Sequence, residues 1–405
     1  MKLLAVATFC FPDHFGGAER VLADVCAGLA GRGHEVTLLT GQVGDSAARE
    51  VRDGVQVVRY PVRQGHPLRF YRSVWRGVRA ALAAGVGADA DVLSTHQLLS
   101  AVAALAPGGS PCRARVASFY APYHLEYLAR YRAGRAHGPV PLLPRAISTV
   151  LRRGDRYVLK ASQQVLVLSR YSLEQVAGLH GPSLEHSTIA PAGVDLSRFR
   201  PPADEAERRA CRAACGLSDE PQPLLLSVRR LVPRMGLADL LEAAAQLVAD
   251  GLPLRVAIAG DGPERQALRR LADERGLAGL VTLLGRVPDE LLPELYRAAD
   301  VFVLPTRSLE GYGMVTAEAL ASGLPVVATV AGASAEVLGE LPEARLVPPG
   351  QPEALAAALR PLVTDSAARR QAGHHARAHA ERRLGWERHL DAFEQAAARA
   401  MEAAR

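Results

Sequence analysis

Cysteine, lysine and aromatic residues are scarce in this chain, and long apolar runs are missing. The 405 residues include five cysteines, an odd and small number that is atypical of a disulfide scaffold and predicts a reducing compartment. Aromatic residues make up 5% of the chain, and only Lys2 and Lys160 among the 48 basic residues are lysines. No apolar run approaches the ~20 residues of a membrane-spanning helix. The apolar start, Met1–Cys10, lacks a small-x-small cleavage site and predicts a buried first strand rather than a signal peptide.

Basic residues are concentrated in the first half of the chain. The net charge is +6, but residues 1–199 carry a net +9 and the remainder carries a net −3. This asymmetry predicts that the first half meets something anionic. We expect a cytoplasmic protein with no nucleic acid partner, and peripheral contact with the inner membrane face through the basic N-terminal domain is one option.

Strands and helices are expected to alternate along nearly the whole chain. The strands expected in the first half are 3–9, 36–39, 55–60, 91–94, 115–119, 165–169 and 187–190, and those in the second are 224–228, 255–259, 281–284, 301–304 and 325–328. This alternation predicts an α/β fold with two Rossmann-like, doubly wound parallel-sheet domains facing across a cleft that binds ligands. We place the first domain at 1–198, the second at 205–380 and the linker within 195–223. A final helix at about 384–405 is expected to pack back on the first domain.

The strongest chemical signal is the segment 310–318, where two glutamates lie eight positions apart. Glu310 falls in the loop after a predicted buried strand, and Glu318 falls inside the helix that follows. Glycines at 311 and 313 let backbone N–H groups approach a ligand, and the helix N-terminus adds partial positive charge, which suits a diphosphate. The two carboxylates suit paired hydroxyls on a sugar and a ribose. A surface loop before a capped helix has the same spacing, so spacing alone leaves both interpretations open.

With this segment, the chain resembles the retaining GT-B glycosyltransferases of family 4, whose hallmark is a glutamate pair eight residues apart. The match extends to segments 16–19, 189–195 with Phe199, 228–233, and 324–328 with Gly332 and Glu336, in the family's order. The resemblance covers nearly the whole chain. It implies a GT-B fold and transfer of a sugar from a nucleoside diphosphate sugar to an acceptor hydroxyl, with retention of anomeric configuration.

The resemblance also implies roles for individual residues. Glu310 would hold hydroxyls of the donor sugar, Glu318 the ribose hydroxyls, and Arg230 would neutralise the diphosphate. The backbone of Gly311, Tyr312, Gly313, Met314 and Val315 would face the diphosphate and sugar. Arg286 and Val287 would contact the base, and Gly16 and Gly17 would approach the donor phosphate and the acceptor. Trp386 would lie where the chain returns to the first domain. The family uses no metal and no other cofactor, because positive side chains and a helix dipole take the metal's place.

Two positions depart from the family pattern. Met235 replaces a lysine, and we expect Arg229 or Arg234 to supply the missing charge. Tyr120 stands where many members have histidine, and it can bond a sugar hydroxyl but carries no positive charge. His96, at the end of the 91–94 strand, is either a donor-site contact or a structural histidine.

Alternative functions remain open from the sequence. A nucleotide-sugar epimerase can share this architecture, but it needs an acid–base carboxylate pair that we do not find in the expected loops. A non-catalytic nucleotide-sugar binder gains weight from the two departures. The acceptor is a small molecule, a glycan or a lipid-linked sugar. The spacing in residues 69–82 predicts a helix with a stripe of arginines beside an apolar stripe of Tyr71, Trp75, Val78 and Leu82. Such a helix either lies on acidic lipid or packs its apolar stripe against the core of the domain.

Overall fold

A computed structural model describes residues 1–14, 16–133, 140–181, 186–339, 341 and 344–405 of the chain. Contacts divide the chain into two compact units. Unit 1 contains Met1–Arg132, residues 140–193 and Trp386–Arg405, and unit 2 contains Val194–Gly385. The chain leaves unit 1 after Gly193 and returns to it at Trp386. These two points are neighbours, as the hydrogen bond from the Val194 N–H to the Leu384 carbonyl at 2.7 Å shows.

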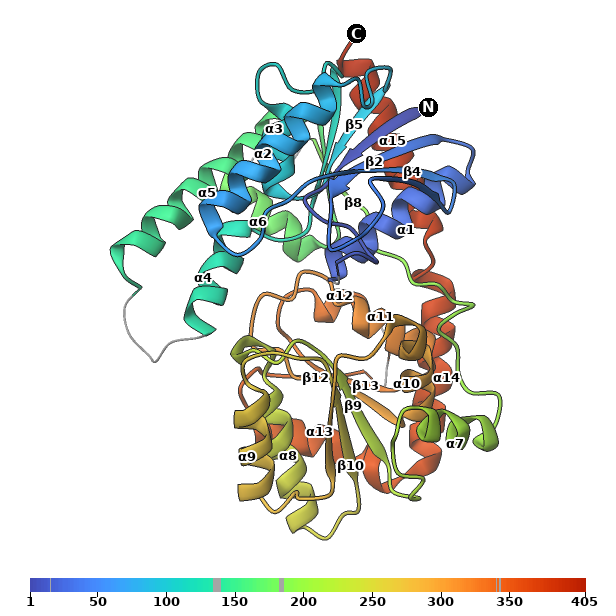
Figure 1. Cartoon of the computed structure of the whole chain (residues 1–405). Coiled ribbons are helices and arrows are strands. Elements are labelled where there is room, and N and C mark those ends of the chain that lie inside the picture. Colours follow the sequence, from blue (N-terminus) through green and yellow to red (C-terminus); the bar gives the residue numbers. More distant parts are fainter. Residues whose placement is uncertain (15, 134–139, 182–185, 340, 342–343) are drawn as a thin grey trace. The chain divides into compact units, whose positions relative to one another are not determined.

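Unit 1 is built on one eight-stranded sheet (Figure 1). Its strand order is β3-β4-β2-β1-β5-β6-β7-β8. Every pair of neighbouring strands is parallel except β3 and β4. The strands are β1 (Lys2–Val6), β2 (Glu35–Gly41), β3 (Arg49–Arg52), β4 (Val55–Tyr60), β5 (Val92–Thr95), β6 (Ala114–Phe119), β7 (Gln164–Val167) and β8 (Ser187–Ile189). Parallel strands need crossover connections, which the intervening helices provide.

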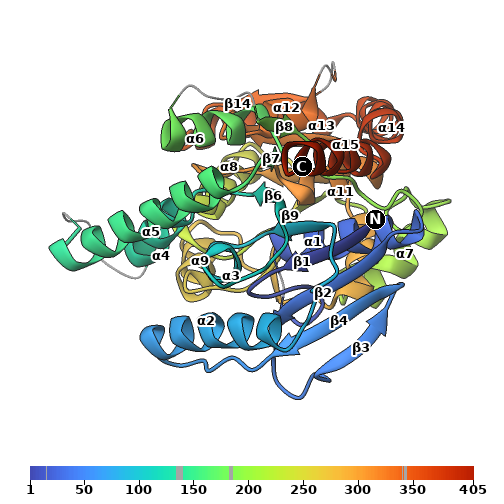
Figure 2. The same ribbon diagram turned by 90° about the horizontal axis from the view of Figure 1, so that it is seen from above.

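Helices cover both faces of this sheet (Figure 2). One face carries α2 (Pro67–Ala83), α3 (Leu98–Leu105), α4 (Tyr123–Ala133) and α5 (Leu142–Ala161), and the other carries α1 (Gly17–Gly31) and the terminal helix α15 (Glu387–Ala403). The helix α6 (Arg170–His180) connects β7 to β8. Buried side chains of β1, α2 and α3, among them Leu4, Val78 and Ala104, form one continuous core. A parallel sheet needs such a covering of helices on each face.

Unit 2 has a six-stranded, all-parallel sheet in the order β11-β10-β9-β12-β13-β14. Its strands are β9 (Leu224–Val228), β10 (Arg255–Ala259), β11 (Val281–Gly285), β12 (Val301–Leu304), β13 (Val326–Thr329) and β14 (Arg345–Val347). Its helices are α7 (Glu205–Ala214), α8 (Leu237–Ala249), α9 (Arg265–Glu274), α10 (Leu292–Ala298), α11 (Met314–Ala321), α12 (Ser334–Leu338), α13 (Pro352–Thr364) and α14 (Ser366–Arg383), with short 3-10 turns at Pro233–Met235 and Asp289–Leu291.

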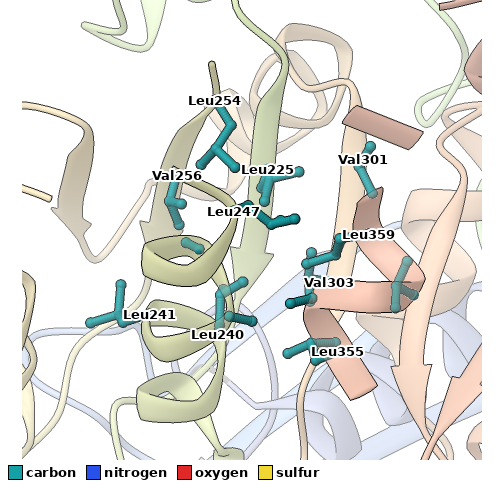
Figure 3. Close-up of a cluster of buried hydrophobic side chains, with 14 of the residues drawn as sticks. Leu225, Leu240, Leu241, Leu247, Leu254, Val256, Val301, Val303, Leu355 and Leu359 are labelled. Carbon is teal, nitrogen blue, oxygen red and sulfur yellow. The ribbon is translucent and has the colours of Figure 1, made fainter. Parts of the chain in front are cut away.

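The core of unit 2 lies between the sheet and helices α8 and α13 (Figure 3). Leu240 and Leu247 of α8 and Leu359 of α13 point toward Leu225 of β9 and Val303 of β12, and all five are fully buried. This packing fixes the sheet whose carboxyl edge carries the loops that follow β9 and β12.

The expected α/β alternation with two parallel sheets is confirmed, and β4, β9, β10 and β12 have the predicted bounds. Three expectations need correction. The first strand ends at Val6, because the N–H groups of Thr8 and Phe9 donate to the Gln97 side chain instead. The short polar strand β3 and the edge strand β14 were not predicted. The helix α7 lies inside the predicted linker, where its buried Arg212 donates to Asp300 at 2.8 Å.

Candidate active site

The loop between β12 and α11 holds Glu310 in a fixed position in unit 2. Leu309 has a positive φ of 59°, which turns the chain just before Glu310. The Glu310 carbonyl accepts from the Ala333 N–H at 2.9 Å. A Cβ at Gly332 would lie 2.0 Å from that carbonyl oxygen, so only glycine allows this approach. The Glu310 side chain is buried, which fixes its carboxylate within the loop.

The Glu310 carboxylate is the centre of a buried polar cluster. It forms an ion pair with Arg229, which follows β9, and both side chains are at most 10% exposed. The same Arg229 Nη2 donates to Thr306 Oγ1 at 3.0 Å and lies 2.7 Å from Met235 Sδ. Thr306 Oγ1 in turn donates to Glu310 Oε2 at 3.2 Å. The Arg229 guanidinium therefore lies directly beside the position where the family has a lysine.

The second glutamate lies in α11 and is held by a tyrosine from α10. Tyr296 OH donates to Glu318 Oε2 at 2.7 Å, and Glu318 is 3% exposed. Gly313 directly precedes this helix, and its φ of 92° favours glycine. Within the first turn the hydroxyl of Thr316 is buried and has no hydrogen-bond partner. The first turn of α11 therefore lies between two buried carboxylates, and its N-terminus suits an anion.

Other predicted residues lie around this cluster in unit 2. The Arg234 guanidinium donates to the carbonyl of Leu309 at 3.1 Å, so it supports the loop that carries Glu310. Arg230 follows Arg229 and is exposed. Among the loop residues, Tyr312 is buried and Gly311, Met314 and Val315 are half-buried. Arg286 and Val287 follow β11, which two strands, β10 and β9, separate from β12; Arg286 is exposed and Val287 is half-buried.

The predicted residues of unit 1 form a separate group. His96 follows β5 and is fixed through both ring nitrogens, with Nδ1 2.8 Å from Tyr120 OH and Nε2 3.0 Å from Ser94 Oγ. Burial, together with the nearby His389, lowers the pKa of His96 to about 3, so the ring is neutral at pH 7. Burial raises the pKa of Tyr120 well above its usual value. Gly16 and Gly17 are exposed at the start of α1. The pair His96 and Tyr120 can exchange hydrogen bonds but carries no charge.

Two residues of these clusters were missed by the sequence interpretation. Thr306 comes two residues after the buried strand β12, a place where parallel sheets present ligand-binding groups, and that position was the available signal. Gln97 anchors the loop after β1, because its Oε1 accepts from Thr8 and Phe9 while its Nε2 donates to Glu19 at 3.2 Å. Nothing in the local sequence of Gln97 indicates this role.

Comparison with known proteins identifies the family. Residues 15–198 match the family described as Glycosyltransferase Family 4, and residues 215–379 match the family described as Glycosyl transferases group 1. The GDP-mannose-dependent alpha-(1-6)-phosphatidylinositol monomannoside mannosyltransferase of Mycobacterium tuberculosis is 32% identical over 84% of this chain and 83% of that protein. The protein of the same description from Mycolicibacterium smegmatis is 35% identical, but the match spans only 60% of its length. The D-inositol 3-phosphate glycosyltransferase of Xylanimonas cellulosilytica is 30% identical over 95% of this chain and 93% of its own.

Solved structures share the fold. Sucrose-phosphate synthase from Thermosynechococcus elongatus superposes with a TM-score of 0.79 at 22% identity over 99% of both chains. The catalytic domain of starch synthase IV from Arabidopsis thaliana gives a TM-score of 0.73 at 15% identity, again over 99% of both chains. The matches cover both units, and the hallmark glutamates lie buried in the second. The chain therefore belongs to the family 4, group 1 glycosyltransferases and has their GT-B fold of two parallel-sheet α/β domains.

Proposed function

We propose that this glycosyltransferase moves a sugar from a nucleoside diphosphate sugar to an acceptor hydroxyl with retention of anomeric configuration and without a metal ion. The observation that carries this proposal is the buried cluster in which Arg229 pairs with Glu310 beside the N-terminus of α11. A buried carboxylate next to a cation and a helix N-terminus supports binding of a sugar hydroxyl and a diphosphate within a few ångströms of each other.

The residues of unit 2 would divide the work between sugar and nucleotide. Glu310 would accept a hydrogen bond from the donor sugar, and Glu318, fixed by Tyr296, would accept from the ribose. Arg229, Arg230 and the N-terminus of α11 would stabilise the negative charge that develops on the departing diphosphate. Preorganised positive charge of this kind acts where a metal ion would otherwise act. The acceptor would then attack from the face that the leaving group has just vacated, which preserves the configuration without a covalent enzyme intermediate.

Arg229, rather than Arg234, is our candidate for the charge that the family normally supplies at position 235. Its guanidinium lies 2.7 Å from Met235 Sδ and contacts the Glu310 carboxylate. Arg234 instead donates to backbone carbonyls of the 308–309 segment. Arg229 would thus supply the positive charge from a different position in the chain, with Met235 in contact with its guanidinium. Arginine suits the role because its planar fork can bind phosphate oxygens in pairs.

The relatives suggest which substrates to test first. The relatives from Mycobacterium tuberculosis and Mycolicibacterium smegmatis are described as GDP-mannose-dependent and as acting on phosphatidylinositol monomannoside. The Xylanimonas relative is described as acting on D-inositol 3-phosphate, so a phosphorylated inositol is common to these acceptors. A net charge of +9 in residues 1–199 fits an acceptor of that kind. We therefore propose GDP-mannose as the first donor and inositol phosphates or phosphatidylinositol mannosides as the first acceptors.

A cytoplasmic location is part of the proposal. All five cysteines lie in the described part of the chain as free, buried thiols, which fits a reducing compartment. Within the described residues, no helix has both the length and the apolar character that crossing a membrane requires.

Incubation with a panel of GDP-, UDP-, ADP- and TDP-sugars tests the proposed function against its alternatives. We expect one donor to raise the melting temperature and to release free nucleotide slowly without acceptor and faster with one. A sugar that changes configuration while still attached to the nucleotide would indicate an epimerase. Binding of a donor with no turnover toward any inositol, glycan or lipid-linked acceptor would favour a non-catalytic binder.

A further inference from the structure

One helical face of unit 1 is strongly basic. The helices α2, α3 and α5 lie side by side in one layer over the sheet (Figure 2), and the structure describes all their residues. They carry nine basic residues: Arg69, Arg72, Arg76, Arg79, Arg145, Arg152, Arg153, Arg156 and Lys160. Their one acidic residue, Asp155, is buried and bonded to His124 Nδ1 at 3.0 Å. These three helices thus present positive charge outward and have no exposed acidic residue.

Large apolar side chains are exposed among these cations. Leu142 and Leu143 at the start of α5 are 83% and 72% exposed, and Val150 in its middle is 63% exposed. Leu68 and Trp75 of α2 are 67% and 42% exposed. Isolated exposed apolar residues are normal, but these lie on the same two helices as the arginines. Exposed aliphatic side chains between cations are typical of helices that lie in a lipid interface.

The structure decides between the two alternatives for the apolar stripe of α2. Val78 and Leu82 pack in the core of unit 1, as the second alternative expected, and only Trp75 of that stripe is exposed. The Arg79 guanidinium donates to the carbonyls of Ala106 and Pro107, so fewer of its N–H groups face outward. The greater part of the exposed basic and apolar surface therefore belongs to α5, whose 20 residues extend over ~30 Å.

The opposite face of unit 1 has a different character. There α15 carries both signs of charge, and three of its acidic residues, Glu387, Asp391 and Glu394, pair with Arg32 after α1. The positive charge of unit 1 is thus concentrated on one face rather than spread over the domain.

We propose that the exposed face of α2 and α5 docks on the surface of an anionic lipid bilayer. The arginines would bind lipid phosphates in pairs, and the exposed leucines and valine would enter the boundary between head groups and acyl chains. A single-stranded nucleic acid fits less well, because its bases stack on exposed aromatic side chains, whereas the exposed apolar groups here are mainly aliphatic. Docking would hold the transferase at a surface where lipid acceptors are found, but the proposal stands on the charge and exposure of these helices alone.

Sedimentation with vesicles tests the proposal. We expect the protein to sediment with vesicles of phosphatidylcholine and phosphatidylglycerol at low salt, to do so less at 500 mM salt, and not to sediment with pure phosphatidylcholine. The double variant Arg153→Glu with Arg156→Glu should bind anionic vesicles at least about tenfold more weakly. The double variant Leu142→Ser with Leu143→Ser should weaken the binding that remains at high salt.

A matched control separates the position of the charge from its amount. Arg388→Glu with Arg399→Glu makes the same charge change at exposed sites on α15, on the other face, and should leave vesicle binding nearly unchanged. Three results would overturn the proposal. They are equal losses of vesicle binding in the α5 arginine variant and the α15 control, no binding of the wild type to anionic vesicles, and tighter binding to an oligonucleotide than to vesicles. Melting temperatures check folding. Nucleotide release from the soluble donor, measured in the same samples, separates failure of docking from failure of the proposed transferase activity.

Discussion

At the scale of single residues, the two hallmark glutamates should give different kinetic defects. Glu310→Gln removes the charge from the sugar side of the site and should lower kcat by ~10–150-fold, which corresponds to ~1.5–3 kcal/mol for a charged hydrogen bond. Glu318→Ala should mainly raise the Kd for the nucleotide, because the proposed partner of this carboxylate, which Tyr296 holds in place, is the ribose. Steady-state kinetics and nucleotide titration separate the two effects.

A melting curve is a necessary control for the first variant. Glu310→Gln leaves the buried Arg229 without its carboxylate, so part of any loss could be a loss of stability. A Glu310→Gln protein that melts like the wild type and keeps near-normal turnover would contradict the assignment of this site.

The proposal that Arg229 supplies the charge of the lysine missing at position 235 makes a second prediction at this scale. Arg229→Ala should lower turnover at least about tenfold, equivalent to ~1.4 kcal/mol of barrier. Met235→Lys alone should leave turnover level or lower it, because a second cation would be placed beside Arg229. Combining the two substitutions should restore much of the activity lost in Arg229→Ala. A tenfold or larger rise in Met235→Lys would mean instead that the wild-type site lacks this charge.

At the scale of elements, buried apolar strands were predictable and polar elements were not. The four residues of β12 are all buried and apolar, and the prediction gave its bounds correctly. The strand β3 reads Arg-Glu-Val-Arg and has no fully buried residue, so its pairing with β4 depends on the fold around it. The helix α7 buries only Cys211 and Arg212, and such a charged segment is hard to distinguish from a linker.

The terminal helix α15 makes a pH-dependent contribution to the stability of unit 1. Its His389 is buried, and Nδ1 contacts the Ala190 carbonyl at 2.9 Å. Burial lowers the pKa of His389 to about 4 from an ordinary 6.5, despite the opposing effect of the carbonyl contacts. The folded state therefore binds fewer protons than the unfolded state between these values. The resulting stability is fully present above pH ~6.5 and is lost as the pH falls toward 4.

Substitution of His389 tests this linkage. His389→Asn keeps a donor near the Nδ1 position but removes the titrating group. Urea unfolding should be measured from pH 4.5 to 6.5. The free energy of unfolding of the variant should fall less steeply with decreasing pH than that of the wild type, and the slope should be smaller by about one proton, or ~1.4 kcal/mol per pH unit. An unchanged slope would show that His389 does not titrate on unfolding.

At the scale of the whole molecule, the order of motifs predicted the fold and supplied the candidate site residues, whereas the contacts among them came from the structure. Glu310 and Glu318 were found from their spacing and the family resemblance. The pairing of Arg229, after β9, with Glu310, after β12, joins residues 81 positions apart, and Thr306 from the loop of Glu310 completes the cluster. Such meetings depend on which strands are neighbours in the sheet, and one sequence does not specify that order. The same applies to α2 and α5, whose basic residues share a face only once α3 is placed between them.

The most direct test of the account is the anomeric configuration of the first product, observed by proton NMR in the presence of EDTA. Once the panel has identified a donor and an acceptor, the linkage should be read from the coupling constant of the new anomeric proton, or from its one-bond carbon coupling for a mannoside. We predict that an α-linked donor gives an α-linked product at an undiminished rate in EDTA. A β-linked product, or transfer that stops in EDTA and resumes when a divalent cation is added, would contradict retaining, metal-independent transfer at the Arg229 and Glu310 site.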